Sequence, residues 1–137
     1  MRLPFLLILG LAVVQVSADA VLVANTKHAG SKLTTDQVAN AYLGKKVALA
    51  DGTVLVPVNQ NEGKPIRDEF LQKVTGKSDA QIKSYWAKLA FTGKGDAPKD
   101  VGGDADVKKM VAGNPSMIGY IDKGAVDASV SVVYTAE

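Results

Sequence analysis

The residues from Val54 to Phe70 combine a strand pattern, a polar loop and a helix start in an order that favours anion binding. The apolar run Val54–Val58 predicts a strand, residues 59–63 predict a loop, and residues 64–70 predict the beginning of a helix. The first backbone N–H groups of a helix have no partners inside it, and the helix dipole places partial positive charge there. Small anions bind at such strand-to-helix junctions in α/β proteins. The junction is therefore a candidate anion site.

Five residues of the junction are candidates for contact with an anion: Asn61, Glu62, Gly63, Lys64 and Arg67. Gly63 would let the backbone approach the ligand, because a residue without a Cβ tolerates close contact. Lys64 and Arg67 would supply positive charge, and the N–H groups of Ile66 and its neighbours would donate hydrogen bonds.

A simpler interpretation of the same residues is surface ion pairing. Pro65 has no N–H to donate, and proline is a common first residue of helices for reasons unrelated to ligands. Lys64 and Arg67 alternate with Glu62 and Asp68, so these four side chains could neutralise one another at the surface. The residues alone favour this interpretation over an anion site.

Other residues that could do chemistry lack the partners that their reactions require. His28 is the single histidine and the chain has no cysteine, so we expect a surface-loop histidine rather than a ligand or base. Asp104 and Asp106 resemble part of a calcium loop but lack its closing Glu, and acids at a helix start explain them better. Gly76–Ser78 resembles the end of a Walker A motif, but Leu71 replaces the earlier glycine. We expect neither an enzyme nor a bound metal or cofactor.

The N-terminal residues have the pattern of a secretory signal peptide. A basic start precedes the apolar run Leu3–Val16, and small residues then allow cleavage after Ala18 or Ala20. The run is too short to span a bilayer, although an uncleaved anchor is the alternative. We therefore expect a signal peptide at residues 1–18, one domain at residues 19–137 and a periplasmic location, which the absence of cysteine weakly favours.

Charge argues against some partners. Lysines are interleaved with Asp and Glu, and the formal net charge of the 137 residues is only +2. A mixed surface of this kind lacks the basic stripe that nucleic acids require. We expect no nucleic-acid partner, and no membrane contact after signal cleavage.

The elements around the junction alternate between strand and helix patterns. Capping boxes at Thr34 and Ser78 and stop signals at Gly44, Gly76 and Gly113 bound the expected helices. The expected strands are 20–24, 47–49, 54–58, 117–121 and 130–134, with a hairpin turn at Asp51-Gly52 and a loop over 92–104. An apolar stripe through Ile82, Tyr85, Trp86 and Leu89 predicts core packing of one helix. The mixture predicts an α/β domain with a mixed sheet.

Phrases along the chain resemble, in order, those of periplasmic phosphate-binding proteins, the solute receptors of phosphate ABC importers. They are Leu33–Val38 with Tyr42–Lys45, Asp51-Gly52 with Val56–Asn59, Gly63–Phe70, Trp86 with Phe91–Gly95, and Ser116–Tyr120. The resemblance implies one lobe of a type II periplasmic-binding-protein-like fold, with a mixed β-sheet flanked by helices. It also implies that Gly63–Phe70 corresponds to the phosphate loop of that family, typically Gly-Ser-Gly-Thr-Arg-Asp-x-Phe.

Two departures from the family pattern weaken the expected site. Family receptors have two lobes and more than twice this length, so a ligand here would have one wall unless another protein supplied the second. Lys64, Pro65 and Ile66 replace the family's Ser, Gly and Thr, which removes two hydroxyl donors and one N–H.

The resemblance gives two hypotheses about function. The first is an exported, non-enzymatic solute-binding-like domain, related to phosphate ABC transporter receptors, that binds phosphate or another small anion weakly at loop 59–67. The second is a periplasmic structural or adaptor protein that has lost ligand binding and contacts another periplasmic protein, or a second copy of itself, through the lobe.

Overall fold

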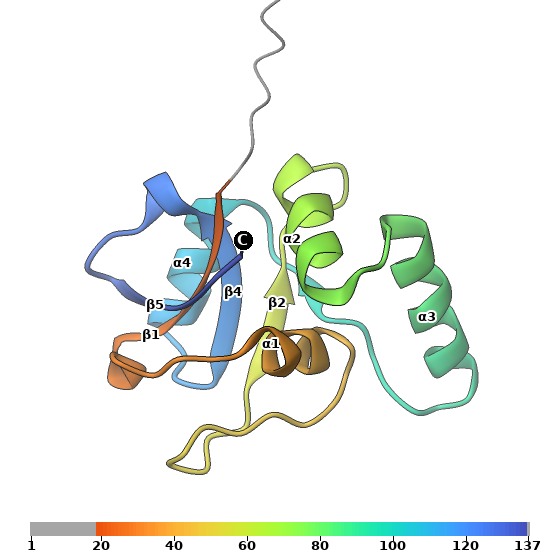
Figure 1. Ribbon diagram of the computed structural model, residues 1–137, viewed down its shortest axis with the longest axis horizontal. Coiled ribbons are helices and arrows are strands. Elements are labelled where there is room, and N and C mark those ends of the chain that lie inside the picture. Colours follow the sequence, from red (N-terminus) through yellow and green to blue (C-terminus); the bar gives the residue numbers. More distant parts are fainter. Residues whose placement is uncertain (1–18, 137) are drawn as a thin grey trace, which may run out of the picture.

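One mixed β-sheet organises the chain (Figure 1), and the computed structural model describes residues 19–136. Its strands are β1 (Ala20–Asn25), β2 (Val56–Asn59), β3 (Lys99–Asp100), β4 (Met117–Asp122) and β5 (Val130–Thr135), in the spatial order β3-β2-β4-β1-β5. Strand β1 runs antiparallel to β4 and β5, whereas β2 is parallel to both β3 and β4. The expected α/β class with a mixed sheet is confirmed. The expected signal peptide lies outside the described residues.

The helices are α1 (Thr35–Tyr42), α2 (Pro65–Thr75), α3 (Asp79–Phe91) and α4 (Asp104–Ala112), with short 3-10 turns η1 (Thr26–His28) and η2 (Lys123–Ala125). Both expected capping boxes are present, at Thr34 and at Ser78. Gly76 ends α2 in the left-handed conformation, with φ of 70°, which glycine adopts without a Cβ penalty. Of the helices over residues 19–136, none has the length and apolarity needed to cross a bilayer.

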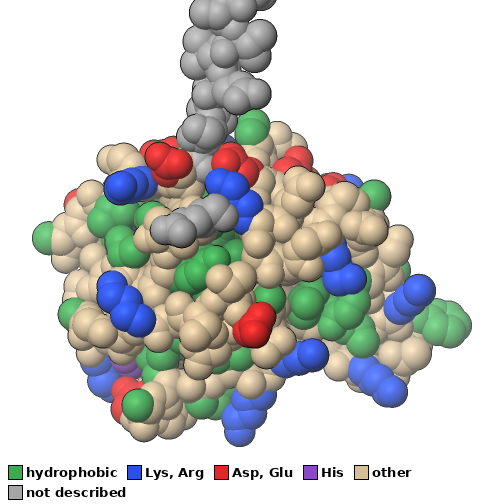
Figure 2. Space-filling model, in the orientation of Figure 1, with side chains coloured by type: hydrophobic (Ala, Val, Ile, Leu, Met, Phe, Trp, Pro, Cys, Tyr) green, Lys and Arg blue, Asp and Glu red, His purple; other side chains and the backbone are tan. Residues whose placement is uncertain are grey.

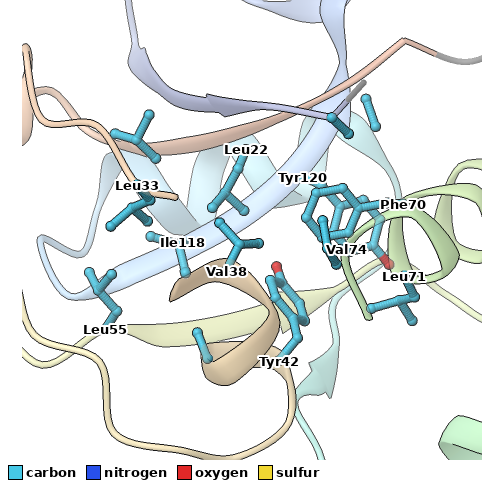
Figure 3. Close-up of a cluster of buried hydrophobic side chains, with 14 of the residues drawn as sticks. Leu22, Leu33, Val38, Tyr42, Leu55, Phe70, Leu71, Val74, Ile118 and Tyr120 are labelled. Carbon is cyan, nitrogen blue, oxygen red and sulfur yellow. The ribbon is translucent and has the colours of Figure 1, made fainter. Parts of the chain in front are cut away.

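Helices cover both faces of the sheet. Alternate residues of β1 and β4 pack with α1 and α2 in one cluster, and the residues between them pack with α4 in a second cluster. Because both of its faces are covered, β1 is buried along its whole length. In the first cluster, the Tyr120 ring stacks on Phe70 at 4.4 Å between centroids, and Tyr42 meets Phe70 edge-on at 5.4 Å (Figure 3).

A glycine in β4 allows α4 to lie close to the sheet. A Cβ at Gly119 would lie 2.5 Å from Val107 Cγ1 of α4 and 3.0 Å from Val58 Cγ2 of β2. Such contacts are too short for any side chain. Gly119 thus sets the spacing between α4 and the strand that leads to the candidate site.

Three expectations about the elements are wrong in detail. The hairpin around Asp51-Gly52 is reduced to one bridge between Ala48 and Val54, because β2 begins at Val56 and pairs with β4 instead. The expected loop over 92–104 contains β3, whose two residues are too few to give a strand pattern. On α3, Ile82 and Trp86 are buried but Tyr85 and Leu89 are only half-buried, because α3 stands at the side of the molecule (Figure 1).

His28 is buried, which corrects the expectation of a surface-loop histidine. The residue is 4% exposed, with Nε2 2.7 Å from the carbonyl oxygen of Pro115 and Nδ1 3.7 Å from Asp51 Oδ2. The turn at residues 50–53 folds back far enough to reach the ring, a long-range contact that local sequence does not encode. A hydrogen bond to the carbonyl requires the proton on Nε2. His28 therefore joins η1 to the loop before β4 as a structural group.

Candidate anion-binding site

The loop between β2 and α2 is anchored by Gln60, the first residue after β2. Its side chain is buried, and its Nε2 donates to Asp104 Oδ1 at 2.7 Å and to the Tyr120 carbonyl at 3.0 Å. The next N–H, of Asn61, donates to the Gly102 carbonyl at 2.9 Å. Asp104 lies in the first turn of α4, as expected, but it also fixes this loop. These bonds hold the loop in one position against β4 and α4.

Two buried tyrosines position the end of β2. Tyr120 Oη donates to Asn59 Oδ1 at 2.9 Å and accepts from the Gln60 N–H at 3.1 Å, while Tyr42 Oη donates to the Val58 carbonyl at 2.8 Å. Burial raises the pKa of both phenols above the ordinary value, and for Tyr42 the neighbouring Tyr120 adds to the effect. Both tyrosines thus remain neutral donors at physiological pH.

Arg67 is buried at the first turn of α2. It is 6% exposed, and its Nη1 donates to the Gln60 carbonyl at 2.9 Å and to Asp100 Oδ1 at 2.8 Å. The expected ion pairing is confirmed only in part: Glu62 Oε1 lies 4.0 Å from Arg67 Nη2, but Asp68 forms no described ion pair with Arg67, and the guanidinium is buried rather than at the surface. Arg67 shares the inner face of α2 with residues three and four positions later, Phe70 and Leu71, so its side chain turns inward.

Carboxylates surround the Arg67 guanidinium. Besides Asp100, Asp79 Oδ1 lies 4.0 Å from its Nε. Lys83 joins the network, with Nζ 3.5 Å from Glu62 and 3.3 Å from Asp79, and the hydrogen bond to Asp79 raises the pKa of Lys83. The network contains two cations and three carboxylates, so its sum is negative. Asp100 Oδ1 occupies a position at which an oxyanion would contact the guanidinium.

Some donors of the junction are still available. The Arg67 Nε donor is buried and has no hydrogen-bond partner within the described residues. The Asp79 Oδ1 acceptor is likewise buried without a hydrogen-bond partner. No side chain caps α2, and in residues 19–136 the N–H groups of Gly63 and Ile66 donate to no other protein group. Gly63 has φ of 88°, which requires glycine. The helix start can therefore still offer backbone donors to an anion.

The five sequence-predicted residues lie in the loop and the first turn of α2, but they do not point to one centre. Asn61, Glu62, Gly63 and Lys64 are exposed, whereas the guanidinium of Arg67 lies beneath the loop. Lys64 extends toward Gly103 at the start of α4. Sequence reasoning missed the residues that neutralise Arg67 or fix the loop: Gln60, Asp79, Lys83 and Asp100. The inward spacing of Arg67 with Phe70 was a signal that a buried acid must lie nearby. In the described part of the chain, no group of three or more His, Cys, Asp or Glu side chains is arranged to hold a metal ion.

Solved structures with a similar fold include phosphate-transport receptors. An ABC-type phosphate transport receptor from Vibrio cholerae is 21% identical, with a TM-score of 0.63 over 84% of this chain and 45% of the receptor. A putative phosphate ABC transporter substrate-binding protein from Clostridium perfringens, solved with bound phosphate, is 27% identical, with a TM-score of 0.59 over 84% and 44%. PstS from Borrelia burgdorferi is 11% identical, with a TM-score of 0.59 over 85% and 46%.

These comparisons define the class of fold. No protein-family model and no curated protein matches the sequence. The chain spans less than half the length of each receptor named above, as expected for a single-lobe relative. It has the α/β fold of one part of the phosphate ABC transporter substrate-binding proteins, with a five-stranded mixed sheet flanked by helices.

Proposed function

We propose that residues 19–137 form an exported, periplasmic, non-enzymatic domain that binds phosphate or another small oxyanion weakly at loop 59–67. The observation that carries the proposal is the uncapped start of α2, where the N–H groups of Gly63 and Ile66 have no partner in residues 19–136 and the buried Arg67 follows in the first turn. The likeness to receptors for phosphate transport supports the choice of anion. Asn61, Glu62, Gly63, Lys64 and Arg67 are the proposed contact residues.

Weak rather than tight binding follows from the charges and from the shape of the site. Asp100 already contacts Arg67 at 2.8 Å, so an incoming anion must share the guanidinium with a carboxylate. The family's loop hydroxyls are absent, and the loop residues Asn61–Lys64 are exposed. Tight ligand sites bury most of their ligand. For an exposed site of this kind we expect a Kd in the millimolar range, which corresponds to a binding free energy of about −4 kcal/mol.

Export is part of the proposal, and the fold favours one of the two cleavage positions. The carbonyl of Asp19 accepts from the Lys123 N–H at 2.8 Å, and the carbonyl of Ala20 accepts from the Ala136 N–H at 3.2 Å. Cleavage after Ala20 would remove both acceptors, whereas cleavage after Ala18 keeps them. We therefore expect the mature protein to begin at Asp19, which mass spectrometry of the exported protein can check.

Titration calorimetry with phosphate tests the proposed ligand. The mature chain is expected to give saturable heat at millimolar phosphate, and Lys64→Gln is expected to weaken binding three- to tenfold. Lys64 is exposed, so the variant is expected to fold, as circular dichroism would verify. Lys32→Gln, an exposed lysine outside the loop, is the matched control and should leave the affinity unchanged. Absence of heat from the folded wild-type chain would mean that the site has lost its ligand.

A second candidate function is that of an adaptor without a ligand, which contacts another periplasmic protein or a second copy of this chain. Phe91 favours it, because this aromatic side chain at the end of α3 is 94% exposed. Exposed aromatic residues are enriched at protein interfaces. Sedimentation of the wild-type chain and of Phe91→Ser would test self-association. Pull-down of a specific periplasmic partner by the wild-type chain, lost with Phe91→Ser, would favour the adaptor.

A further inference from the structure

A groove of about 500 Å³ lies beside β2, between the end of α1, the helix α3 and the helix α4. Its apolar lining includes Val54, Val56, Trp86, Val101, Met110 and Met117. Figure 2 shows hydrophobic side chains at the surface between α1 and α3, with Lys and Arg side chains around them. The volume falls within the range of small-molecule sites.

Three of the four exposed large hydrophobic residues of the described chain line the groove. Val54, Val56 and Met110 are 41%, 47% and 38% exposed, and all three line it; Phe91 is the one other large hydrophobic residue exposed in residues 19–136. Single exposed apolar residues are ordinary, but a contiguous group of them marks a binding surface. Two methionines in the lining, Met110 and Met117, can adapt to ligands of different shape.

The charges of the groove favour an anionic ligand. Lys45, Lys46 and Lys99 line it together with one carboxylate, that of Asp96. Lys45, Lys46 and Lys99 form no ion pair with any described residue. Three cations beside an apolar floor are complementary to a molecule with an apolar body and a negative head.

The β2 strand argues against an extended peptide as the occupant, because β3 already pairs with it at Val58 and Asn59. An extended peptide binds a sheet edge through backbone hydrogen bonds with each exposed N–H and C=O. Pro57 stands in the middle of β2 and lines the groove, and it has no N–H to donate. Just before β2, the Leu55 N–H already donates to the Val47 carbonyl at 2.9 Å. The occupant is therefore held by apolar contact and charge rather than by strand pairing.

We propose that this groove binds a free amphiphilic monocarboxylate, of the class of medium-chain fatty acids with about ten carbons. The apolar chain packs on Trp86, Val56 and Met110, and the carboxylate pairs with the lysines at the rim. The site is separate from loop 59–67 and does not depend on phosphate binding there.

The fluorescence of Trp86 can report ligand binding in the groove, because it is the single tryptophan of the chain and lines the site. Decanoate, titrated into the mature chain below its micelle-forming concentration, is expected to shift the Trp86 emission in a saturable manner. Decanol, which lacks the charge, is expected to bind at least tenfold more weakly. Unchanged emission with decanoate, or equal affinity for decanol, would overturn the proposal.

Charge variants test the proposed role of the lysines. The double variant Lys46→Glu/Lys99→Glu is expected to weaken decanoate binding at least tenfold, and Val56→Asp at an exposed floor position is expected to do the same. Lys32→Glu/Lys123→Glu, two exposed lysines outside the groove, should leave the affinity unchanged. Circular dichroism would verify that each variant folds. Unchanged decanoate affinity in the groove variants would refute the assignment.

Two competition measurements distinguish decanoate binding in the groove from anion binding at loop 59–67 and from binding to a membrane. Millimolar phosphate should not displace decanoate; displacement would mean that both anions share loop 59–67 and would overturn a separate site. Vesicles with an anionic lipid should compete poorly with free decanoate. Binding of vesicles without binding of the monomer would assign the surface to a membrane and refute the proposal.

Discussion

Substitution of Asp100 by Asn should convert the weak anion site into a stronger one. Asp100 Oδ1 lies 2.8 Å from Arg67 Nη1, and the Arg67 side chain is buried whereas that of Asp100 is 41% exposed. Asn has nearly the same shape and can still accept the hydrogen bond from Arg67. The substitution therefore removes the competing charge while leaving the loop in place.

The size of the effect follows from Coulomb's law. An anion on the opposite edge of the guanidinium would lie about 6 Å from the Asp100 carboxylate, where one unit charge contributes roughly 1.4 kcal/mol at an effective dielectric constant of about 40. Removal of that repulsion should tighten phosphate binding about tenfold. Loss of the ion pair should lower the free energy of unfolding by about 1 kcal/mol, because the Asp100 side chain is partly exposed and Asn can keep the hydrogen bond.

The assay is phosphate titration of the wild-type chain and of Asp100→Asn at constant low ionic strength, by calorimetry. Asp36→Asn makes the same change of charge at an exposed residue of α1 and serves as the control. Urea unfolding of each protein measures the cost in stability. If Asp100→Asn folds and binds phosphate no better than Asp36→Asn, the carboxylate does not compete for Arg67, and the account of the site is wrong.

Three further predictions concern the core and its titration. Gly119→Ala should lower the free energy of unfolding by about 2 kcal/mol, because its Cβ would lie 2.5 Å from Val107, whereas Gly113→Ala, with nothing nearer than 3.4 Å, should cost far less in the same urea experiment. Because burial raises the pKa of Tyr42 and Tyr120, the folded state holds their protons more tightly than the unfolded chain does. Stability should therefore be intact below pH of about 10 and fall above it, by about 1.4 kcal/mol per pH unit for each phenol. The alkaline slope of Tyr42→Phe should be shallower than that of the wild-type chain, and equal slopes would show that Tyr42 does not contribute. At pH 7, Tyr42→Phe should cost about 1 kcal/mol through the lost hydrogen bond to Val58, and a gain in the urea midpoint would contradict this.

The elements that local signals define could be predicted from the sequence. Capping boxes at Thr34 and Ser78 and the left-handed stop at Gly76 fix helix ends through bonds within a few residues. The strands with long apolar runs were also clear, because both faces of the sheet are covered. Strand β3 escaped prediction, since its two residues form only when β2 is already in place.

The strand-to-helix junction of the candidate site was predicted, but its electrostatics were not. The loop and Arg67 follow from the strand-to-helix pattern, whereas the partner Asp100 comes from a segment 33 residues later in the chain. His28 was misjudged for the same reason, because its contacts with Asp51 and Pro115 depend on distant turns. Long-range pairing of polar groups leaves no local pattern, so the sequence alone could not show that Arg67 already pairs with Asp100.

The measurement that tests the central claim most directly is a phosphate titration of the ¹⁵N-labelled mature chain followed by NMR. The account predicts that the amide signals of Gly63, Lys64 and Ile66 move in a saturable manner at millimolar phosphate, and that equal amounts of chloride leave them in place. A folded chain in which these amide signals stay fixed throughout the titration would contradict an anion site at the start of α2.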